Sequence, residues 1–228
     1  MPPDALLFLS SHCPHCAALL TALADLVKRG VIGRMEAVNL EILPQAGAAL
    51  GVRGVPWLRL GPFTLLGAHT REELEIWAGR AASPEGMADA FHDLLKTGGL
   101  PQVLQLVAED TARLAALLPI VGNPEASINV RLGAGVVFED HAGSPALWAL
   151  IPALGTLTGH ADARVRADAC HYLGLSGSPD ARPWLEKRLE DANADVREIA
   201  RDGLNPSLAV PDQAALPLAS GREDHHNK

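Results

Sequence analysis

Two kinds of reactive side chain alternate close to the start of the chain, at His12, Cys13, His15 and Cys16. Thiols and imidazoles this close together can hold a metal ion, form a structural disulfide or act as a reactive thiol pair. The apolar run 5–9 precedes them and is typical of a short buried strand. Residues 14–29 then repeat apolar side chains at helical spacing as far as Gly30. The motif is therefore expected in the turn between a strand and a helix.

A cysteine at the start of a helix faces unsatisfied backbone N–H groups and the positive end of the helix dipole, and both favour its thiolate. Cys13 is expected there as the nucleophile. Cys16 lies one turn further on and can attack a mixed disulfide formed at Cys13. Pro14 suits a first helical turn, and His15 adds a donor and, when protonated, a positive charge. His12 fits either a general acid/base or a solvated loop residue.

Two other interpretations of this motif stay open. The four side chains are suitable zinc ligands, although the chain has no second CxxC or HxxxH motif to complete a site. A structural disulfide between Cys13 and Cys16 would close a very small loop and restrain little chain entropy. The motif thus favours a redox-active thiol pair, with no metal and no other cofactor.

Composition restricts the classes of partner. Of the 228 residues, 48% are hydrophobic and 4% aromatic, which favours helices over a β-sandwich. The net charge of −8 comes entirely from residues 83–228, which hold 12 basic and 20 acidic side chains. An acidic surface repels phosphate backbones, so nucleic acid is not an expected partner.

A membrane is not an expected partner either. No apolar run approaches the 18 residues of a membrane span, and the N-terminus has neither a basic flank nor a long apolar core of the secretory kind. These features predict a cytoplasmic protein. In a reducing compartment, a CxxC pair is more often catalytic or metal-binding than structural.

The pattern of the first eighty or so residues predicts β-α-β-α-β-β-α. After the first strand and helix, strands are expected at 34–40, 57–60 and 63–67, and a short helix at 44–50. A last helix is expected to be capped by Thr70 and to run through Trp77. From Ser83 the pattern becomes helical, and residues 83–109 are expected to form linking helices.

An internal repeat fills the helical part. A shift of 31 residues aligns 152–173 with 183–204, with eight identities in 22 positions, and a looser copy lies 35 residues upstream. Each copy indicates a helix, an Asp-rich turn and a second helix. Asp162 and Asp195 are expected to cap the second helices. The following arginines, Arg166 and Arg197, are expected to hydrogen-bond neighbouring turns.

These units resemble HEAT repeats over residues 110–204, in the short form also seen in phycobilin-lyase-like proteins, where a turn ending in Val-Arg opens the second helix. The resemblance implies an α-solenoid whose repeats stack because none buries its apolar face alone. It implies an extended surface for a protein partner. Cys170 lies in a repeat helix and is expected to be half-buried and inert. The tail, 205–228, is expected to be disordered, with solvated His225 and His226.

The segment GVRGVPWLRL places Val55 and Pro56 before a strand, 40 residues after Cys16. Together with CPHC, it makes residues 1–82 resemble the thioredoxin superfamily in its compact glutaredoxin-like form. The resemblance implies a cis Val55–Pro56 bond, with Pro56 packed beside Cys13 and Val55 pairing with the substrate backbone. Trp57 is expected in the core.

Two departures from that family qualify the resemblance. Its buried Asp in the first strand and its Trp before the first cysteine are replaced here by apolar residues such as Leu7 and by His12. Glutathione-binding members also carry a Gly-Gly followed by acidic residues after the fourth strand, where this chain reads GAHTREE. The overall expectation is an α/β thioredoxin-like domain followed by a HEAT-type solenoid. Its expected function is thiol–disulfide oxidoreduction on a protein, and the alternative is a non-enzymatic, redox-responsive interaction scaffold.

Overall fold

The computed structural model describes residues 1–205, so most of the segment expected to be a disordered tail lies outside the described residues. The strands are β1 (Asp4–Leu9), β2 (Arg34–Asn39), β3 (Trp57–Leu60) and β4 (Phe63–Leu66). The helices that accompany them are α1 (Cys16–Lys28), α2 (Pro44–Ala48) and α3 (Arg71–Ala81). The expected order of strands and helices is confirmed.

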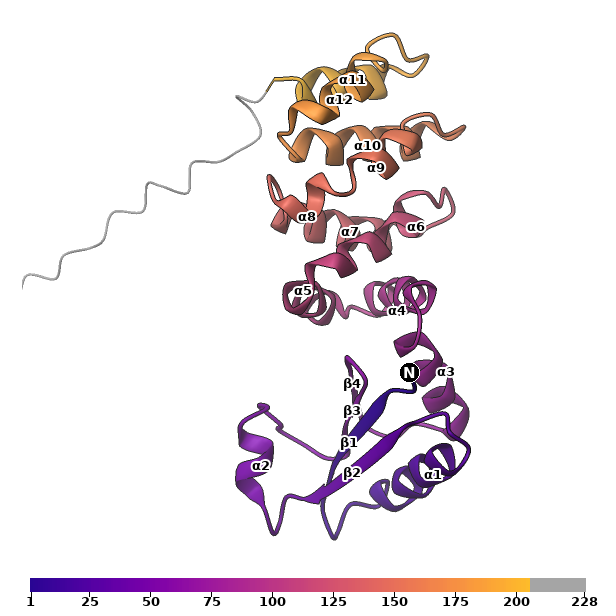
Figure 1. Cartoon of the computed structure of the whole chain (residues 1–228), viewed down its shortest axis with the longest axis vertical. Coiled ribbons are helices and arrows are strands. Elements are labelled where there is room, and N and C mark those ends of the chain that lie inside the picture. Colours follow the sequence, from indigo (N-terminus) through magenta and orange to yellow (C-terminus); the bar gives the residue numbers. More distant parts are fainter. Residues whose placement is uncertain (206–228) are drawn as a thin grey trace, which may run out of the picture.

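All regular secondary structure in the rest of the described chain is helical. The helices are α4 (Pro84–Lys96), α5 (Leu100–Glu109), η1 (Thr111–Leu117), α6 (Leu118–Val121), α7 (Ile128–Asp140), α8 (Pro145–Trp148), α9 (Ile151–Leu157), α10 (Ala163–Leu175), η2 (Pro179–Ala181), α11 (Arg182–Glu186) and α12 (Ala194–Gly203). Figure 1 shows them stacked as a column above the sheet. The expected linking helices over 83–109 are α4 and α5.

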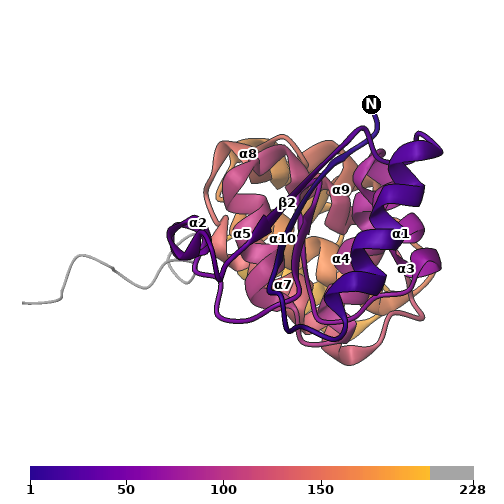
Figure 2. The same cartoon turned by 90° about the horizontal axis from the view of Figure 1, so that it is seen from below.

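The four strands form one small mixed sheet in the order β2-β1-β3-β4. Strand β1 runs parallel to β2 and antiparallel to β3, and β3 is antiparallel to β4. Helices α1 and α3 lie on one side of the sheet and the short α2 on the other (Figures 1 and 2). Leu7 and Leu58 of the sheet and Leu23 of α1 are completely buried, because alternate strand residues and one helix stripe face this layer.

Helix α3 connects the sheet to the solenoid. Thr70 and Glu73 form the capping box that starts it, with Glu73 N–H donating to Thr70 Oγ1 at 3.1 Å. At its other end, Arg80 forms an ion pair with Asp93 of α4. Gln102 of α5 donates from Nε2 to the Thr64 carbonyl of β4 at 3.2 Å, so the solenoid also contacts the outer edge of the sheet.

Arginine–aspartate pairs join successive repeats. Arg131 of α7 donates to Asp168 of α10 at 3.0 and 2.6 Å. Arg166 of α10 donates to Asp191, in the turn before α12, at 2.9 and 2.7 Å. Arg131 makes both bonds to one carboxylate oxygen of Asp168, whereas Arg166 binds both oxygens of Asp191. Both contacts are partly or fully buried and fix the register between helix pairs.

The turns before α10 and α12 share one hydrogen-bond pattern, in which an arginine of the helix donates to two carbonyls of the preceding turn. Arg166 Nη1 donates to the carbonyls of His160 and Ala161 at 3.0 and 2.9 Å. Arg197 Nη1 donates to the carbonyls of Asp191 and Ala192 at 2.7 and 3.1 Å. The expected hydrogen bonds from both arginines to turns are confirmed.

One of the two expected caps is wrong. Asp162 caps α10 by accepting from the N–H of Arg164 at 2.8 Å. At α12, however, the cap is Asn193, which accepts from the N–H groups of Asp195 and Val196 at 2.9 and 3.2 Å. Asn193 is the residue that the 31-residue shift aligns with Asp162, whereas Asp195 already belongs to the first helical turn.

Across residues 1–205, no helix is both long enough and apolar enough to cross a membrane.

The Arg166–Asp191 pair generates a prediction about acid stability. Hydrogen bonding from Arg166 lowers the pKa of Asp191. A carboxylate with a depressed folded-state pKa stabilises the fold above its unfolded pKa, about 3.9, and that contribution disappears as the pH falls through the folded value. Asp191→Asn should therefore lower the free energy of unfolding by about 3 kcal/mol at pH 7, because Arg166 loses its buried partner.

Urea unfolding at pH 7 and at steps below pH 4 measures this effect. The difference between wild type and Asp191→Asn should shrink in acid. Asp202→Asn, at an exposed position of α12, is the control and should change stability by less than about 0.5 kcal/mol. A difference that stays constant with pH would contradict the assigned role of Asp191.

A second prediction concerns the close crossing of α10 and α12. A Cβ atom added at Gly174 would lie 2.8 Å from the Cα of Gly203, a backbone atom that cannot move aside alone. Gly174→Ala should therefore destabilise the protein by about 1–3 kcal/mol. Gly79→Ala in α3 meets nothing within 4 Å and should instead stabilise it by about 0.5–1 kcal/mol. Thermal unfolding should move the two midpoints in opposite directions.

Candidate functional site

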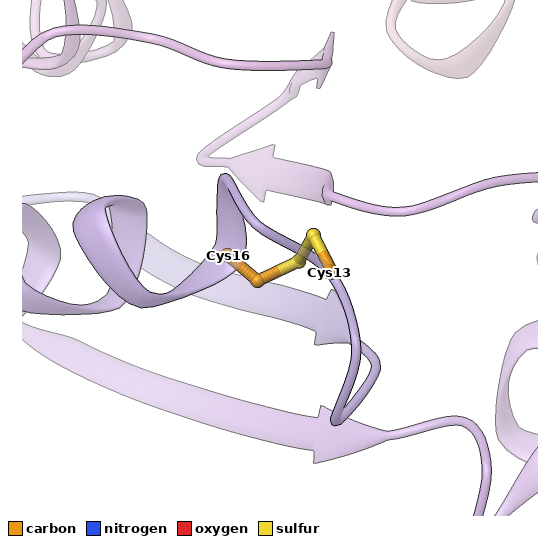
Figure 3. The surroundings of a disulfide bond; sticks show 2 residues. All are labelled: Cys13 and Cys16. Carbon is orange, nitrogen blue, oxygen red and sulfur yellow. A yellow bond between two sulfur atoms is a disulfide. The ribbon is translucent and has the colours of Figure 1, made fainter.

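Cys13 and Cys16 are joined by a disulfide, with 5.4 Å between their Cα atoms. Figure 3 shows the bond between the loop that follows a strand and the first turn of a helix, which are β1 and α1. Cys13 is half-buried, whereas Cys16 is 3% exposed. The pair therefore presents one sulfur-bearing residue to an incoming group and shields the other.

The helix begins later than the expected residue 14. Its N-cap is His15 and its first residue is Cys16. The N–H of Cys16 bonds to the Cys13 carbonyl at 3.4 Å, and helical bonding starts with Leu19 N–H to His15 O at 3.3 Å. Cys13 and Pro14 thus lie in a tight turn before the helix, and Cys16 rather than Cys13 occupies its first turn. The offset is of the size by which helix ends commonly vary.

Three of the predicted tuning residues lie on the surface around the disulfide. His12, Pro14 and His15 are exposed. Within residues 1–205, neither imidazole makes a hydrogen bond or an ion pair, so both are free to contact an incoming group. Their tuning role stays a prediction.

The Val55–Pro56 peptide bond is cis, as the sequence resemblance implied. Trp57 pairs with Phe8 in the antiparallel register of β1 and β3. Continuing that register by two residues places Val55 and Pro56 opposite the end of β1, where the thiol loop begins. The topology therefore brings both segments to the same end of the sheet.

Val55 and Pro56 differ in how their backbone groups are used. The Pro56 carbonyl accepts from Gly67 N–H at 3.0 Å. In the part of the chain that the structure describes, neither the N–H nor the C=O of Val55 has a hydrogen-bond partner. The Val55 side chain is half-buried and that of Pro56 is buried. Val55 thus has a backbone donor and acceptor available for another chain.

Trp57 packs against Phe8 on the sheet face opposite α1, with ring centroids 5.3 Å apart. Both side chains are buried, at 8% and 2% exposure. The expectation that Trp57 is a core residue is confirmed.

Some residues at this end of the sheet were not identified from the sequence. Asn39, the last residue of β2, donates from Nδ2 to Ser11 Oγ at 2.9 Å, and Leu40 N–H bonds to Leu9 O at 2.9 Å. These contacts hold the start of the thiol loop against β2. In the sequence, the one signal for this contact is the polar residue Asn39 at the end of a predicted strand. Its partner, Ser11, is identified by the structure.

Large apolar side chains are also exposed at this end. Leu66, which pairs with Trp57 across β3 and β4, is 68% exposed. Ile42 and Leu43, just after β2, are 74% and 46% exposed. These three side chains lie at the same end of the sheet as the thiol loop and the Val55 segment. An apolar partner could therefore contact them there.

Two further kinds of site were considered from the sequence, a metal site and the third cysteine, Cys170 of α10. Among residues 1–205, no group of three or more His, Cys, Asp or Glu side chains is placed to hold a metal ion. Cys170 is completely buried rather than half-buried, and burial raises the pKa of its thiol to about 11. Its expected inertness therefore has a physical basis.

The three cysteines should differ in reactivity once the disulfide is reduced. We expect iodoacetamide at pH 7 to alkylate Cys13 first, Cys16 more slowly because it is buried, and Cys170 last. Raising the Cys170 pKa from 9.0 to about 11 lowers its thiolate fraction about a hundredfold. Peptide mass spectrometry over time measures each rate. Equal alkylation rates for Cys13 and Cys16 would contradict the proposal that the two thiols differ in accessibility.

Comparison with known families gives one result for the helical part. A family model described as HEAT repeats matches residues 114–205, from η1 to the end of α12. No curated protein matches the chain. This part of the chain is therefore similar to HEAT repeats, which commonly mediate protein interactions, in agreement with the stacked helix pairs of the structure.

Proposed function

We propose that the protein is a thiol–disulfide oxidoreductase that acts on a protein substrate, with its helical repeats binding a partner. The observation that carries this proposal is the unequal exposure of the two bonded cysteines at the start of α1. A half-buried Cys13 beside a buried Cys16 suits a pair in which one sulfur meets the substrate and the other resolves the intermediate.

In the reducing direction, the Cys13 thiolate attacks one sulfur of a substrate disulfide. A bond forms between Cys13 and that sulfur, and the substrate bond breaks to release a thiolate. The Cys16 thiolate then attacks the Cys13 sulfur, forming the intramolecular disulfide and releasing the second substrate thiolate. Two electrons pass from the cysteine pair to the substrate, and the same steps in reverse oxidise a substrate dithiol.

The arrangement of the first eighty residues supports a thioredoxin-like domain as the basis of this chemistry. The element order β-α-β-α-β-β-α is the one expected from the residue pattern. The mixed sheet has the order β2-β1-β3-β4, with α1 and α3 on one face (Figure 1). We propose this fold family for residues 1–82 on these grounds.

The surroundings of the disulfide suit an extended polypeptide substrate. The unpaired N–H and C=O of Val55 can form the two hydrogen bonds of a short strand pairing. The exposed side chains of Leu66, Ile42 and Leu43 can contact apolar residues of the same segment. We propose that backbone pairing gives affinity and that these side chains favour apolar sequences.

The apolar Leu7 is expected to affect the rate of the reaction. Its side chain is completely buried in β1, at the place where thioredoxins carry an acid that helps the second cysteine to lose its proton. An apolar side chain cannot accept that proton. We therefore expect slower turnover than in thioredoxins, whereas the direction of electron flow depends on the redox potentials of the cysteine pair and of its substrate.

The alternative function is a non-enzymatic interaction scaffold in which the disulfide only regulates docking. The match to HEAT repeats favours this role for residues 114–205, since such repeats commonly bind other proteins. Both functions use the solenoid as a binding surface, and they differ in whether Cys13 turns over.

Insulin reduction by dithiothreitol distinguishes the two functions. Wild type should accelerate the precipitation of insulin chains, and Cys13→Ser should abolish the acceleration because the attacking sulfur is missing. Cys170→Ser removes a buried thiol of the solenoid and is the matched control, which should retain the wild-type rate. Equal rates for wild type and Cys13→Ser would end the enzyme proposal.

A redox titration followed by thiol alkylation determines the direction. A potential near −270 mV, about that of thioredoxin, would identify an electron donor, and one near −120 mV, about that of a strong oxidase, would identify an oxidant. Cys16→Ser should accumulate a mixed disulfide at Cys13 with a model disulfide substrate. Accumulation at Cys16 in Cys13→Ser instead would reverse the assigned roles.

A further inference from the structure

Helix α7 carries three large aliphatic side chains on its outer face. Ile128, Leu132 and Val136 are 61%, 62% and 41% exposed. They lie four residues apart, so they form one continuous stripe along two turns of the helix, about 12 Å long. We call this set the α7 stripe. Exposed aliphatic residues grouped in this way are characteristic of binding surfaces.

The repeat provides an internal comparison for these positions. In α10 the residues aligned with the α7 stripe are Ala163, Ala167 and His171, and in α12 they are Ala194, Glu198 and Asp202. Packing between repeats therefore does not require large aliphatic side chains there. The side chains of α7 that fill the core, such as Val130, Ala134 and Val137, lie on its other face and are buried.

Within residues 1–205, the C-terminal end of α7 carries two carboxylates that have no Lys or Arg partner. Its last turn holds Glu139 and Asp140 and no basic residue, although a helix C-terminus favours cations. The nearest cationic candidates are two histidines, His171 at 3.9 Å from Glu139 and His141 at 3.8 Å from Asp140, and each is charged only when protonated. Both carboxylates are more than half exposed.

We propose that the α7 stripe is a docking site for an amphipathic helical segment of another protein, with large aliphatic residues on one face and Lys or Arg beside Glu139 and Asp140. The stripe has the length and spacing of two turns of such a helix. A basic end would supply the positive charge that the C-terminus of α7 lacks. The α7 helix of a second copy is a poor occupant, because its one basic residue, Arg131, is already paired with Asp168.

This inference adds the chemistry of the partner to the binding role proposed for the solenoid, on which it rests. Helix α7 lies in the helical column, whereas the loop between β1 and α1, where the Cys13–Cys16 disulfide is found, lies at the end of the sheet away from that column (Figure 1). Docking and thiol chemistry can therefore be disrupted separately.

A synthetic peptide of about 18 residues, with Leu on one helical face and Lys on the other, is the probe, and a peptide with Glu in place of Lys is its counterpart. Fluorescence anisotropy should show wild-type protein binding the Lys peptide more tightly, with affinity falling as salt increases. Leu132→Gln should weaken binding about tenfold. Ile76→Gln, at a 55% exposed position of α3, is the matched control and should bind as wild type does.

Hydrogen exchange gives a second measurement, in which the Lys peptide should protect residues 128–140 and leave α1 unchanged. Equal losses in Leu132→Gln and Ile76→Gln, protection elsewhere, or no binding by wild type would overturn the proposal. Leu132→Gln should keep the wild-type insulin activity. Loss of that activity in Cys13→Ser with binding intact identifies a defect in the thiol chemistry alone.

Discussion

Burial of one shared apolar layer holds the molecule together. Helices α1 and α3 cover one face of the sheet. Each pair of solenoid helices has one apolar face that it cannot bury by itself. Side chains from β3, α3, α4 and the helices as far as α12 accordingly belong to a single hydrophobic cluster. Because α3 packs on both the sheet and α4, the position of the thiol loop is fixed relative to the solenoid. The polar contacts between Arg80 and Asp93 and between Gln102 and Thr64 add direction to this packing.

Much of this arrangement could be predicted from the sequence, because its signals are local. Strand β3 matches its expected bounds, and Thr70 caps α3 as expected, since apolar alternation and capping residues act over a few positions. The helix pairs could be predicted because the repeat shows the same pattern twice. The position of Cys13 and Cys16 after β1, around the start of α1, followed from the same reasoning.

Helix ends and exposed apolar side chains were missed or misplaced. Helix α1 starts at Cys16 because its first i→i−4 hydrogen bond runs from Leu19 N–H to His15 O, and apolar periodicity does not indicate which bond comes first. The capping error at α12 came from assigning the role to the aspartate nearest the helix instead of the aligned Asn193. The exposure of Leu66 and of the α7 stripe is invisible in sequence, where apolar residues at regular spacing predict burial.

The two edge strands of the sheet, β2 and β4, differ in what lies beside them. At β4 the solenoid supplies an amide to a strand carbonyl, while β2 has β1 as its one strand neighbour within residues 1–205. Arg34 and Glu36 project from β2 and are exposed. Charged side chains on an open edge discourage uncontrolled strand addition and aggregation. Another polypeptide strand would therefore meet charged side chains at β2 and, at β4, a carbonyl that already accepts from the Gln102 side chain.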